Sequence, residues 1–261
     1  MGGRGASSSI GKASAMGSGT PMPQQVDNTT KVDDTQTASA FSTNYNAFMA
    51  MTDDQKADVI SNAIKQGVAA HLAQNDFQRF VANSGLNEKP DIVSDATLDS
   101  MNGTEIFRTV NNVYDKANDV SYTAPQIAKQ VMGGKVTRVS DNGGSVYGRG
   151  IYFANSYSGS TAAYGNTSGN VKATAVMRAK LNNNAKVISH SSAVNGVSRE
   201  ISSGSKLGKV LSKCDSSSRA SIYAMAKGYN VITSGHGYYN ILNRNAITMS
   251  SDIKAKGTKW K

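Results

Sequence analysis

The chain has 261 residues, of which 38% are hydrophobic, so it can bury the core of one sizeable domain or two small ones. It has no run of the roughly 18 apolar residues that cross a bilayer and no apolar leader, so we expect no membrane segment and a protein that stays where it is made. A single cysteine excludes an internal disulfide framework, and three histidines far apart in sequence show no metal-ligand spacing, so we expect no metal site.

Charge is distributed unevenly along the sequence. The formal net charge is +10, but residues 1–42 carry three basic and three acidic groups and are neutral. Residues 43–107 carry four basic and nine acidic groups, which gives −5, whereas residues 108–261 carry twenty-one basic and six acidic groups, which gives +15. Positive charge gathered in one part favours a polyanionic partner or an anionic ligand, and solubility alone is the competing explanation.

The first 42 residues are rich in Gly, Ser, Thr and Ala and show no hydrophobic period before Phe41. Such a segment buries too little apolar surface to offset the entropy lost on ordering. We therefore predict a disordered tail over residues 1–42.

The next segment, residues 43–103, has the pattern of an acidic helical subdomain. Thr52 is a candidate N-cap, and Gln55 three residues later completes a capping box. An apolar stripe then repeats every four residues and continues through Phe77, Phe80 and Val81 to the stop signal Ser84-Gly85. The stripe consists of Ile60, Ile64, Val68 and Leu72.

From Thr104 onward, strands dominate without a regular alternation of strands and helices, which favours the α+β class. A helix is expected from Thr123-Ala124-Pro125 to Gly133-Gly134, and a half-buried strand with a basic outer face over residues 171–181. Residues 190–206 are predicted to form a long loop, followed by a helix at 216–227. The other predicted strands are 105–110, 136–139 (followed by a turn at 141–144), 185–189, 229–233, 238–243 and 246–249.

The most informative stretch combines two glycines with an apolar and aromatic run. Glycines before a strand allow the backbone to approach a ligand closely, although Gly-x-Gly alone is weak evidence and also suits a tight turn. The stretch is followed by Ser156, Ser158 and Ser160, then by Tyr164 and the strand at 171–181. It reads Tyr147-Gly148-Arg149-Gly150-Ile151-Tyr152-Phe153-Ala154.

This order resembles the signature of the poly(ADP-ribose) polymerase-like members of the ADP-ribosyltransferase superfamily. Residues 106–110 (Ile-Phe-Arg-Thr-Val) resemble its first-motif strand, and residues 237–244 (Gly-Tyr-Tyr-Asn-Ile-Leu-Asn-Arg) resemble its third-motif strand. The resemblance covers roughly residues 104–250 and implies an ADP-ribosyltransferase-like split β-sheet core within 104–261. The first eight residues are also similar to the start of small proteins encoded beside minor head genes in phages of Gram-positive bacteria.

The resemblance implies that NAD is the substrate and assigns roles to particular residues. Tyr152 and Tyr164 would enclose the nicotinamide ring, Gly148 would face its carboxamide, and Arg108 would contact ribose or pyrophosphate. The alternatives are a buried core tyrosine at 152 and a surface strand residue at 108. The implied NAD-binding set is Arg108, Thr109, Gly148, Gly150, Tyr152, Phe153, Ser158 and Tyr164.

The sequence departs from the family at the acidic residue of the third motif, because Tyr238 stands where a Glu is expected. Family members without this Glu are usually mono-transferases or inactive modules. Glu200 in the predicted loop is the candidate replacement, and a loop salt bridge is its competing role. The expected catalytic set is therefore Arg108, Tyr152, Tyr238 and Glu200.

Three hypotheses for the function remain. The first is a phage-encoded NAD-dependent mono-ADP-ribosyltransferase that modifies a protein or nucleic acid of the host. The second is a catalytically inactive protein of the same fold, associated with a phage capsid or with DNA through its basic half. The third is an unrelated α+β binding domain. The first two place the protein in the cytoplasm of the host cell or packaged in a virion.

Overall fold

The computed structural model describes residues 45–66, 75–86, 88–115, 119–134, 146–164, 174–255, 258 and 260. All of them belong to one unit of the chain. The tail expected at 1–42, the strand expected at 136–139 and the turn expected at 141–144 lie outside these residues. The side chain of Tyr164 also lies outside what the structure describes.

The first predicted helix is present, but it is shorter than expected. Helix α2 (Asp53–Lys65) begins with the capping box of Thr52 and Gln55 and ends at Gln66, whose backbone is extended. A separate helix, α3 (Asp76–Ser84), begins at its own N-cap Asn75 and ends at Gly85 in the left-handed conformation, with φ 68°. Val68 and Leu72 of the predicted stripe lie outside the described residues. The prediction that the helix continues to Ser84 is wrong, because α2 ends at Gln66 and α3 has its own N-cap, but the stop signal at Ser84-Gly85 is confirmed.

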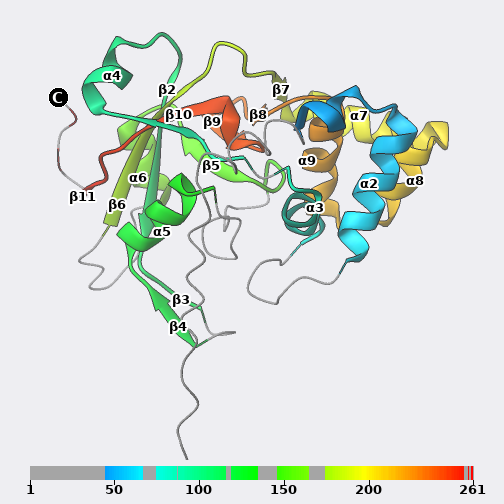
Figure 1. Ribbon diagram of the computed structural model, residues 1–261, viewed down its shortest axis with the longest axis horizontal. Helices are drawn as coiled ribbons and strands as arrows, with labels where there is room; N and C mark the ends of the chain where they lie inside the picture. The colour runs from blue at the N-terminus through cyan, green and yellow to red at the C-terminus, as the bar shows by residue number, and fades with distance from the viewer. Residues whose placement is uncertain are drawn as a thin grey trace, which may run out of the picture. The chain divides into compact units, whose positions relative to one another are not determined.

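These two helices pack with helices from far along the sequence (Figure 1). Their partners are α8 (Lys206–Lys213) and α9 (Ser216–Ala226), on which α7 (His190–Ser203) packs in turn. Phe80 and Ile60 from the first segment share one hydrophobic cluster with Leu211 and Met225. The boundary expected near residue 103 therefore does not divide this core.

Helix α7 corrects the prediction of a loop over residues 190–206. Ser189 caps its N-terminus, and Gly204 ends it with φ 68°. Its buried face is formed by Ala193, Gly196 and Val197, and a Cβ on Gly196 would lie 2.2 Å from the ring of Tyr223 on α9. Helix packing rather than local sequence preference therefore stabilises this segment.

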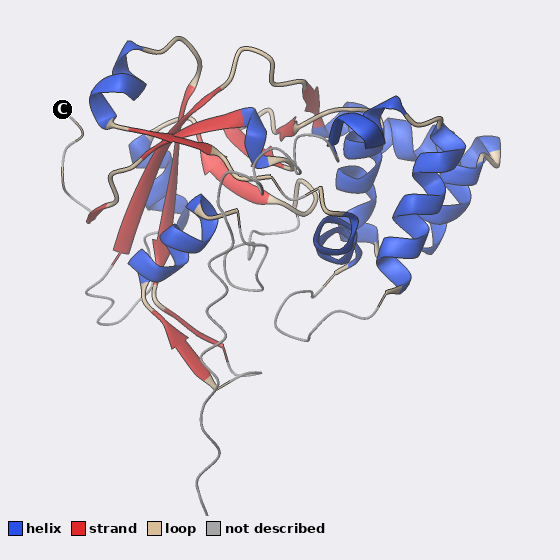
Figure 2. Ribbon diagram, in the orientation of Figure 1, coloured by secondary structure: helices blue, strands red, loops and turns tan. Residues whose placement is uncertain are grey.

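The strands form one mixed sheet of nine strands within the described part of the chain (Figure 2). Pairs β1–β10 and β7–β8 are parallel, and the other pairs are antiparallel. The predicted α+β class is confirmed. In spatial order the strands are β1 (Asp91–Val93), β10 (Ile247–Ser250), β6 (Thr174–Leu181), β2 (Glu105–Asn111), β5 (Ile151–Ala154), β9 (Tyr238–Ile241), β8 (Val231–Thr233) and β7 (Val187–Ser189). Strand β11 (Lys254–Ala255) pairs with β6, and β3 (Val113–Asp115) and β4 (Val120–Tyr122) form a separate hairpin.

The sheet has a weak junction at its centre. Strand β2 pairs with β6 along its whole length, from Glu105 opposite Lys180 to Asn111 opposite Thr174. In contrast, β2 and β5 share only the pair Phe107 and Ala154. We call this junction between β2 and β5 the seam. It divides the sheet into two well-paired halves, β1-β10-β6-β2 and β5-β9-β8-β7.

Helices cover both faces of the sheet near the seam. Helix α5 (Ala124–Met132) packs on the face that carries Ile106, Val110 and Phe153. Helix α6 (Tyr157–Tyr164) covers the other face, where Ser160 hydrogen-bonds Thr109 of β2 over 2.8 Å. Because side chains alternate along a strand, consecutive residues within β2, and likewise within β5, point to opposite faces of the sheet.

Strand β6 does not present the basic outer face that the alternation predicts. Val176 and Arg178 are both buried, and Arg178 is bonded to Asp99 and Glu105. Asp99 belongs to α4 (Asp95–Ser100). Burial would lower the pKa of Arg178, but the hydrogen bonds to these two carboxylates raise it above its ordinary value. Partners from the acidic segment therefore allow a charged side chain to lie inside the fold.

Candidate functional site

The loop that precedes β5 is fixed by the hydroxyl group of Tyr152. This hydroxyl donates a hydrogen bond to the carbonyl oxygen of Gly148 over 2.5 Å and accepts one from the backbone N–H of Tyr147 over 3.0 Å. Tyr152 is only 3% exposed. Its ring lies near that of Tyr147, with centroids 6.4 Å apart. Tyr152 is therefore a buried anchor of the loop that carries the motif.

The two glycines of the motif are required by close packing. Gly148 has φ 86°, and a Cβ there would lie 2.5 Å from the hydroxyl oxygen of Ser221. Gly150 has φ 153°, and a Cβ there would lie 2.1 Å from Oδ1 of Asn240. The Asn240 amide donates to the carbonyl oxygens of Tyr147 and Arg149 over 3.1 and 3.2 Å. The loop is thus held against β9 and α9, and only glycine fits at these positions.

Arg108 lies at the seam rather than on the surface. Its side chain is 5% exposed, and Nη1 donates to the carbonyl oxygen of Tyr152 over 3.0 Å. Phe107 pairs with Ala154, so alternation places Phe107 and Thr109 on the face of Tyr152 and Ala154, and Arg108 on the opposite face. Arg108 therefore bonds the main chain of Tyr152 from the face opposite the Tyr152 ring.

The remaining residues of the implied NAD-binding set have different surroundings. Thr109 is buried against Ser160 of α6, and Phe153 is fully buried in the core beneath α5. Ser158 is exposed on α6. The ring of Tyr157, next to it, packs edge-on against Phe107 with centroids 6.2 Å apart. Thr109 thus shares the sheet face of Tyr152, Ser158 lies exposed on the helix that covers this face, and Phe153 points into the core.

Tyr238 begins β9 and pairs with Ala154 of β5. Tyr152 and Ala154 are two residues apart and lie on the same face of β5. Their partners on β9, Asn240 and Tyr238, lie on that face of the sheet too. Tyr238 is half-buried, and its backbone N–H donates to the hydroxyl of Ser234 over 3.2 Å. The structure therefore brings Tyr238 to the face that carries Tyr152.

Glu200 lies on helix α7 and not in a loop, which corrects the sequence-based expectation. Its carboxylate accepts a hydrogen bond from Ser205 over 2.6 Å and lies 2.8 Å from the ammonium group of Lys227. Burial would raise the pKa of Glu200, but the hydrogen bonds from Lys227 and Ser205 lower it below its ordinary value. Both carboxylate oxygens are thus engaged within the helical cluster.

We call the loop that precedes β5, residues 146–150, the motif loop. A cleft of about 420 Å³ lies beside it, between α7 and α9. Sequence reasoning missed this cleft, because its walls come from the segment predicted as a loop. His190 packs edge-on against Tyr147 with ring centroids 5.5 Å apart, and burial lowers the pKa of His190. The lining residues include Val146, Gly148, His190, Val194, Ser217 and Arg219.

Two further chemical features bear on the site. Burial, with smaller contributions from Asp76 and Asp215, raises the pKa of the Cys214 thiol to about 12, so it is not a nucleophile at neutral pH. Across the described ranges, no cluster of three or more His, Cys, Asp or Glu side chains could hold a metal ion.

No helix within those ranges is long and apolar enough to cross a membrane.

Comparison with known proteins gave no relatives. No family model matches the chain, and neither a curated protein nor a solved structure matches it.

Proposed function

We propose that the protein is an NAD-dependent mono-ADP-ribosyltransferase of the split-sheet fold. The observation that carries the proposal is the neighbourhood of three motif residues. Arg108 on β2, Tyr152 on β5 and Tyr238 on β9 lie on consecutive strands of the sheet, in the order that the resemblance implies. The seam between β2 and β5 also supports a split sheet, because the two halves are joined by a single residue pair.

In this reaction the bond between nicotinamide and its ribose breaks, and the bonding electrons leave with nicotinamide. The ribose becomes an oxocarbenium-like cation, which an acceptor nucleophile captures while losing its proton. The residues near the motif loop would bind and orient NAD: Gly148 would offer backbone groups, and Tyr152 would support the nicotinamide end. Arg108, on the opposite face of the sheet, would act on this site only by holding the carbonyl oxygen of Tyr152.

Transfer should be slow and limited to single ADP-ribose units. Tyr238 stands where the family has Glu, and the carboxylate of Glu200 is already engaged by Lys227 and Ser205. No anionic group at the position of Tyr238 would then stabilise the cation or activate a hydroxyl of the growing chain. We further propose that the protein is phage-encoded and acts in the host cytoplasm or from the virion.

The absence of Glu at position 238 favours a second candidate, a catalytically inactive binding protein of this fold in the virion or on nucleic acid. The hydroxyl of Tyr152 is committed to Gly148 and Tyr147, as a purely structural tyrosine would be. The two candidates differ in one respect, because only the enzyme consumes NAD.

The decisive experiment has a binding step and a transfer step. Titration with NAD should show binding that Tyr152→Ala weakens by roughly 1 to 3 kcal/mol, since the loss of the buried ring and its hydroxyl releases the loop at Gly148 that would face NAD. Tyr114→Ala, which removes an exposed tyrosine of β3, is the matched control and should leave affinity unchanged. Incubation with labelled NAD and host lysate should then transfer label. Binding without transfer supports the second candidate, and no binding in a folded chain rejects both.

A further inference from the structure

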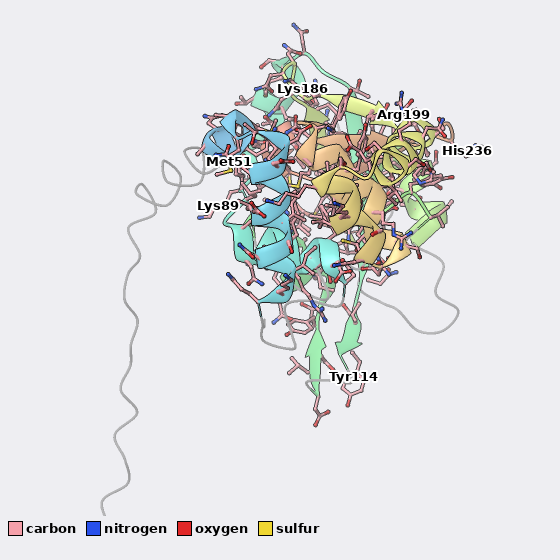
Figure 3. The ribbon with its side chains drawn as sticks, turned by 90° about the vertical axis from the view of Figure 1, so that its right-hand side faces the viewer. Met51, Lys89, Tyr114, Lys186, Arg199 and His236 are labelled. Carbon is pink, nitrogen blue, oxygen red and sulfur yellow. The ribbon has the colours of Figure 1, made fainter. Side chains whose placement is uncertain are left out.

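A groove with lysines along its rim lies between α2 and α8. These two helices face the viewer in Figure 3. Its volume is about 260 Å³. Lys65 of α2 stands on one side, and three lysines of α8 stand on the other, while Ile64 and Val210 provide apolar lining. Two carboxylates, Asp58 and Asp76, also line the groove. We call this feature the lysine groove. The lysines of α8 are Lys206, Lys209 and Lys213.

The charge of this groove is only partly neutralised. The spacing of residues 206, 209 and 213 places their side chains along one face of α8. Lys206 is paired with Asp58 over 2.6 Å. Lys209 and Lys213 are exposed, and among the described residues neither forms an ion pair. Asp76, the other lining carboxylate, accepts a hydrogen bond from the backbone N–H of Asp215 over 2.7 Å and lies 3.7 Å from Arg79. The ammonium groups of Lys209 and Lys213 therefore remain available for an anionic partner.

Arg219 connects the lysine groove to the cleft beside the motif loop. Its guanidinium donates to the carbonyl oxygens of Cys214 and Ser212 over 3.0 and 3.1 Å, which fixes it at the C-terminal end of α8. Arg219 also lines the cleft that Gly148 borders. Arg149, whose Nε donates to Ser217 over 2.8 Å, lies in the motif loop itself. Arg219 and Arg149 thus place two positive side chains between α8 and the loop before β5, and the carboxylate of Asp215 between them is hydrogen-bonded by Ser217 and Ser218.

We propose that this basic path binds the phosphate backbone of a nucleic acid, and that nucleic acid is the acceptor class of the transfer. The second statement rests on the proposed function. Lysine ammonium groups are mobile point charges that suit successive phosphates. An acidic protein partner would need apolar or aromatic anchors at the centre of its interface. The groove offers only Ile64 and Val210 as large aliphatic side chains, and no aromatic residue lines it.

The test measures binding of a short single-stranded DNA and of its duplex by fluorescence anisotropy, without NAD and across a salt series. Each phosphate contact that is lost lowers the magnitude of the slope of log affinity against log salt by about 0.9 for a duplex. The double variant Lys209→Gln/Lys213→Gln should therefore make the slope shallower, lowering its magnitude by about 1.8. The control Lys129→Gln/Lys186→Gln removes the same charge from exposed positions elsewhere and should leave the slope unchanged.

Several outcomes would overturn the proposal. One is equal loss in both double variants, and another is no DNA binding at low salt. Displacement of DNA by polyglutamate at equal charge concentration would assign the groove to an acidic protein instead. The failure of the proposed function is separable from these outcomes. DNA binding without nicotinamide release supports the groove but removes the acceptor assignment, whereas transfer to protein without DNA binding keeps the enzyme and rejects the groove.

Discussion

The hydroxyl of Tyr152 donates to the carbonyl oxygen of Gly148, four residues earlier, over 2.5 Å. The most informative tyrosine of the sequence thus holds the glycine loop that precedes it. Any ligand that binds beside Gly148 therefore depends on Tyr152 for the shape of its site.

Tyr152→Phe removes this hydroxyl but keeps the ring. The buried carbonyl of Gly148 and the N–H of Tyr147 then lose their partner, so we expect the free energy of unfolding to fall by about 1 to 3 kcal/mol. Urea unfolding measures the change. Tyr114→Phe removes a hydroxyl that bonds Asp119 at an exposed position and should cost under about 0.5 kcal/mol. Equal losses in the two variants would contradict the anchoring role.

Gly150→Ala tests the packing of the motif loop. With φ 153° and Oδ1 of Asn240 only 2.1 Å from the new Cβ, this substitution should destabilise the fold by about 2 kcal/mol or more. Gly235→Ala is the matched control, because no atom lies within 4 Å of its Cβ position. Thermal unfolding of both variants checks this, and a melting curve of Gly150→Ala like that of the wild type would show that the loop is not held as described.

Glu200 gives a pH-dependent prediction with a definite sign. Its folded-state pKa lies below the ordinary 4.5, so the stability it contributes is present above pH 4.5 and is lost as pH falls through the folded-state pKa. At neutral pH, Glu200→Gln should cost about 1 kcal/mol, because Lys227 and Ser205 lose a charged partner. Urea unfolding at several pH values should show this difference shrinking in acid. A difference that stays constant down to pH 3 would rule out the ion pair as its source.

The single cysteine should be unreactive while the chain is folded. With a pKa of about 12, the Cys214 thiol is almost entirely protonated at pH 8, and it is 5% exposed. Alkylation by iodoacetamide, followed by mass spectrometry, should be slower by at least about tenfold in buffer than in urea, because the thiolate is the reacting species. Equal rates in the two conditions would show that α8 opens readily at its C-terminal end.

Local signals predicted those elements whose determinants lie close together in the sequence. The predicted capping box of Thr52 with Gln55 is present, the helix predicted to start at Thr123-Ala124-Pro125 does begin there, and α9 ends just before Gly228 as expected. The strands that carry Arg108, Tyr152 and Tyr238 were also predicted. Each of these follows from a cap, a breaker or an apolar run within about a dozen residues.

Distant partners decide what the sequence did not reveal. Helix α7 forms from a Ser- and Gly-rich segment because Gly196 allows close contact with Tyr223, twenty-seven residues later. Arg178 is buried because Asp99 and Glu105 neutralise it. The position of Arg108 on the opposite face from Tyr152 depends on the register between β2 and β5, which a pattern along one strand does not contain.

The central claim is most directly tested by nicotinamide release from NAD in the wild type, Tyr238→Glu and Glu200→Gln. We predict slow release in the wild type, similar release in Glu200→Gln, and an increase of about tenfold or more in Tyr238→Glu, where a carboxylate would face the developing cation. Tyr239→Glu places the charge on the opposite face of β9 and should give no increase. Loss of activity in Glu200→Gln with no gain in Tyr238→Glu would make Glu200 the acid, and no release from any of these folded variants would contradict the assignment as an ADP-ribosyltransferase.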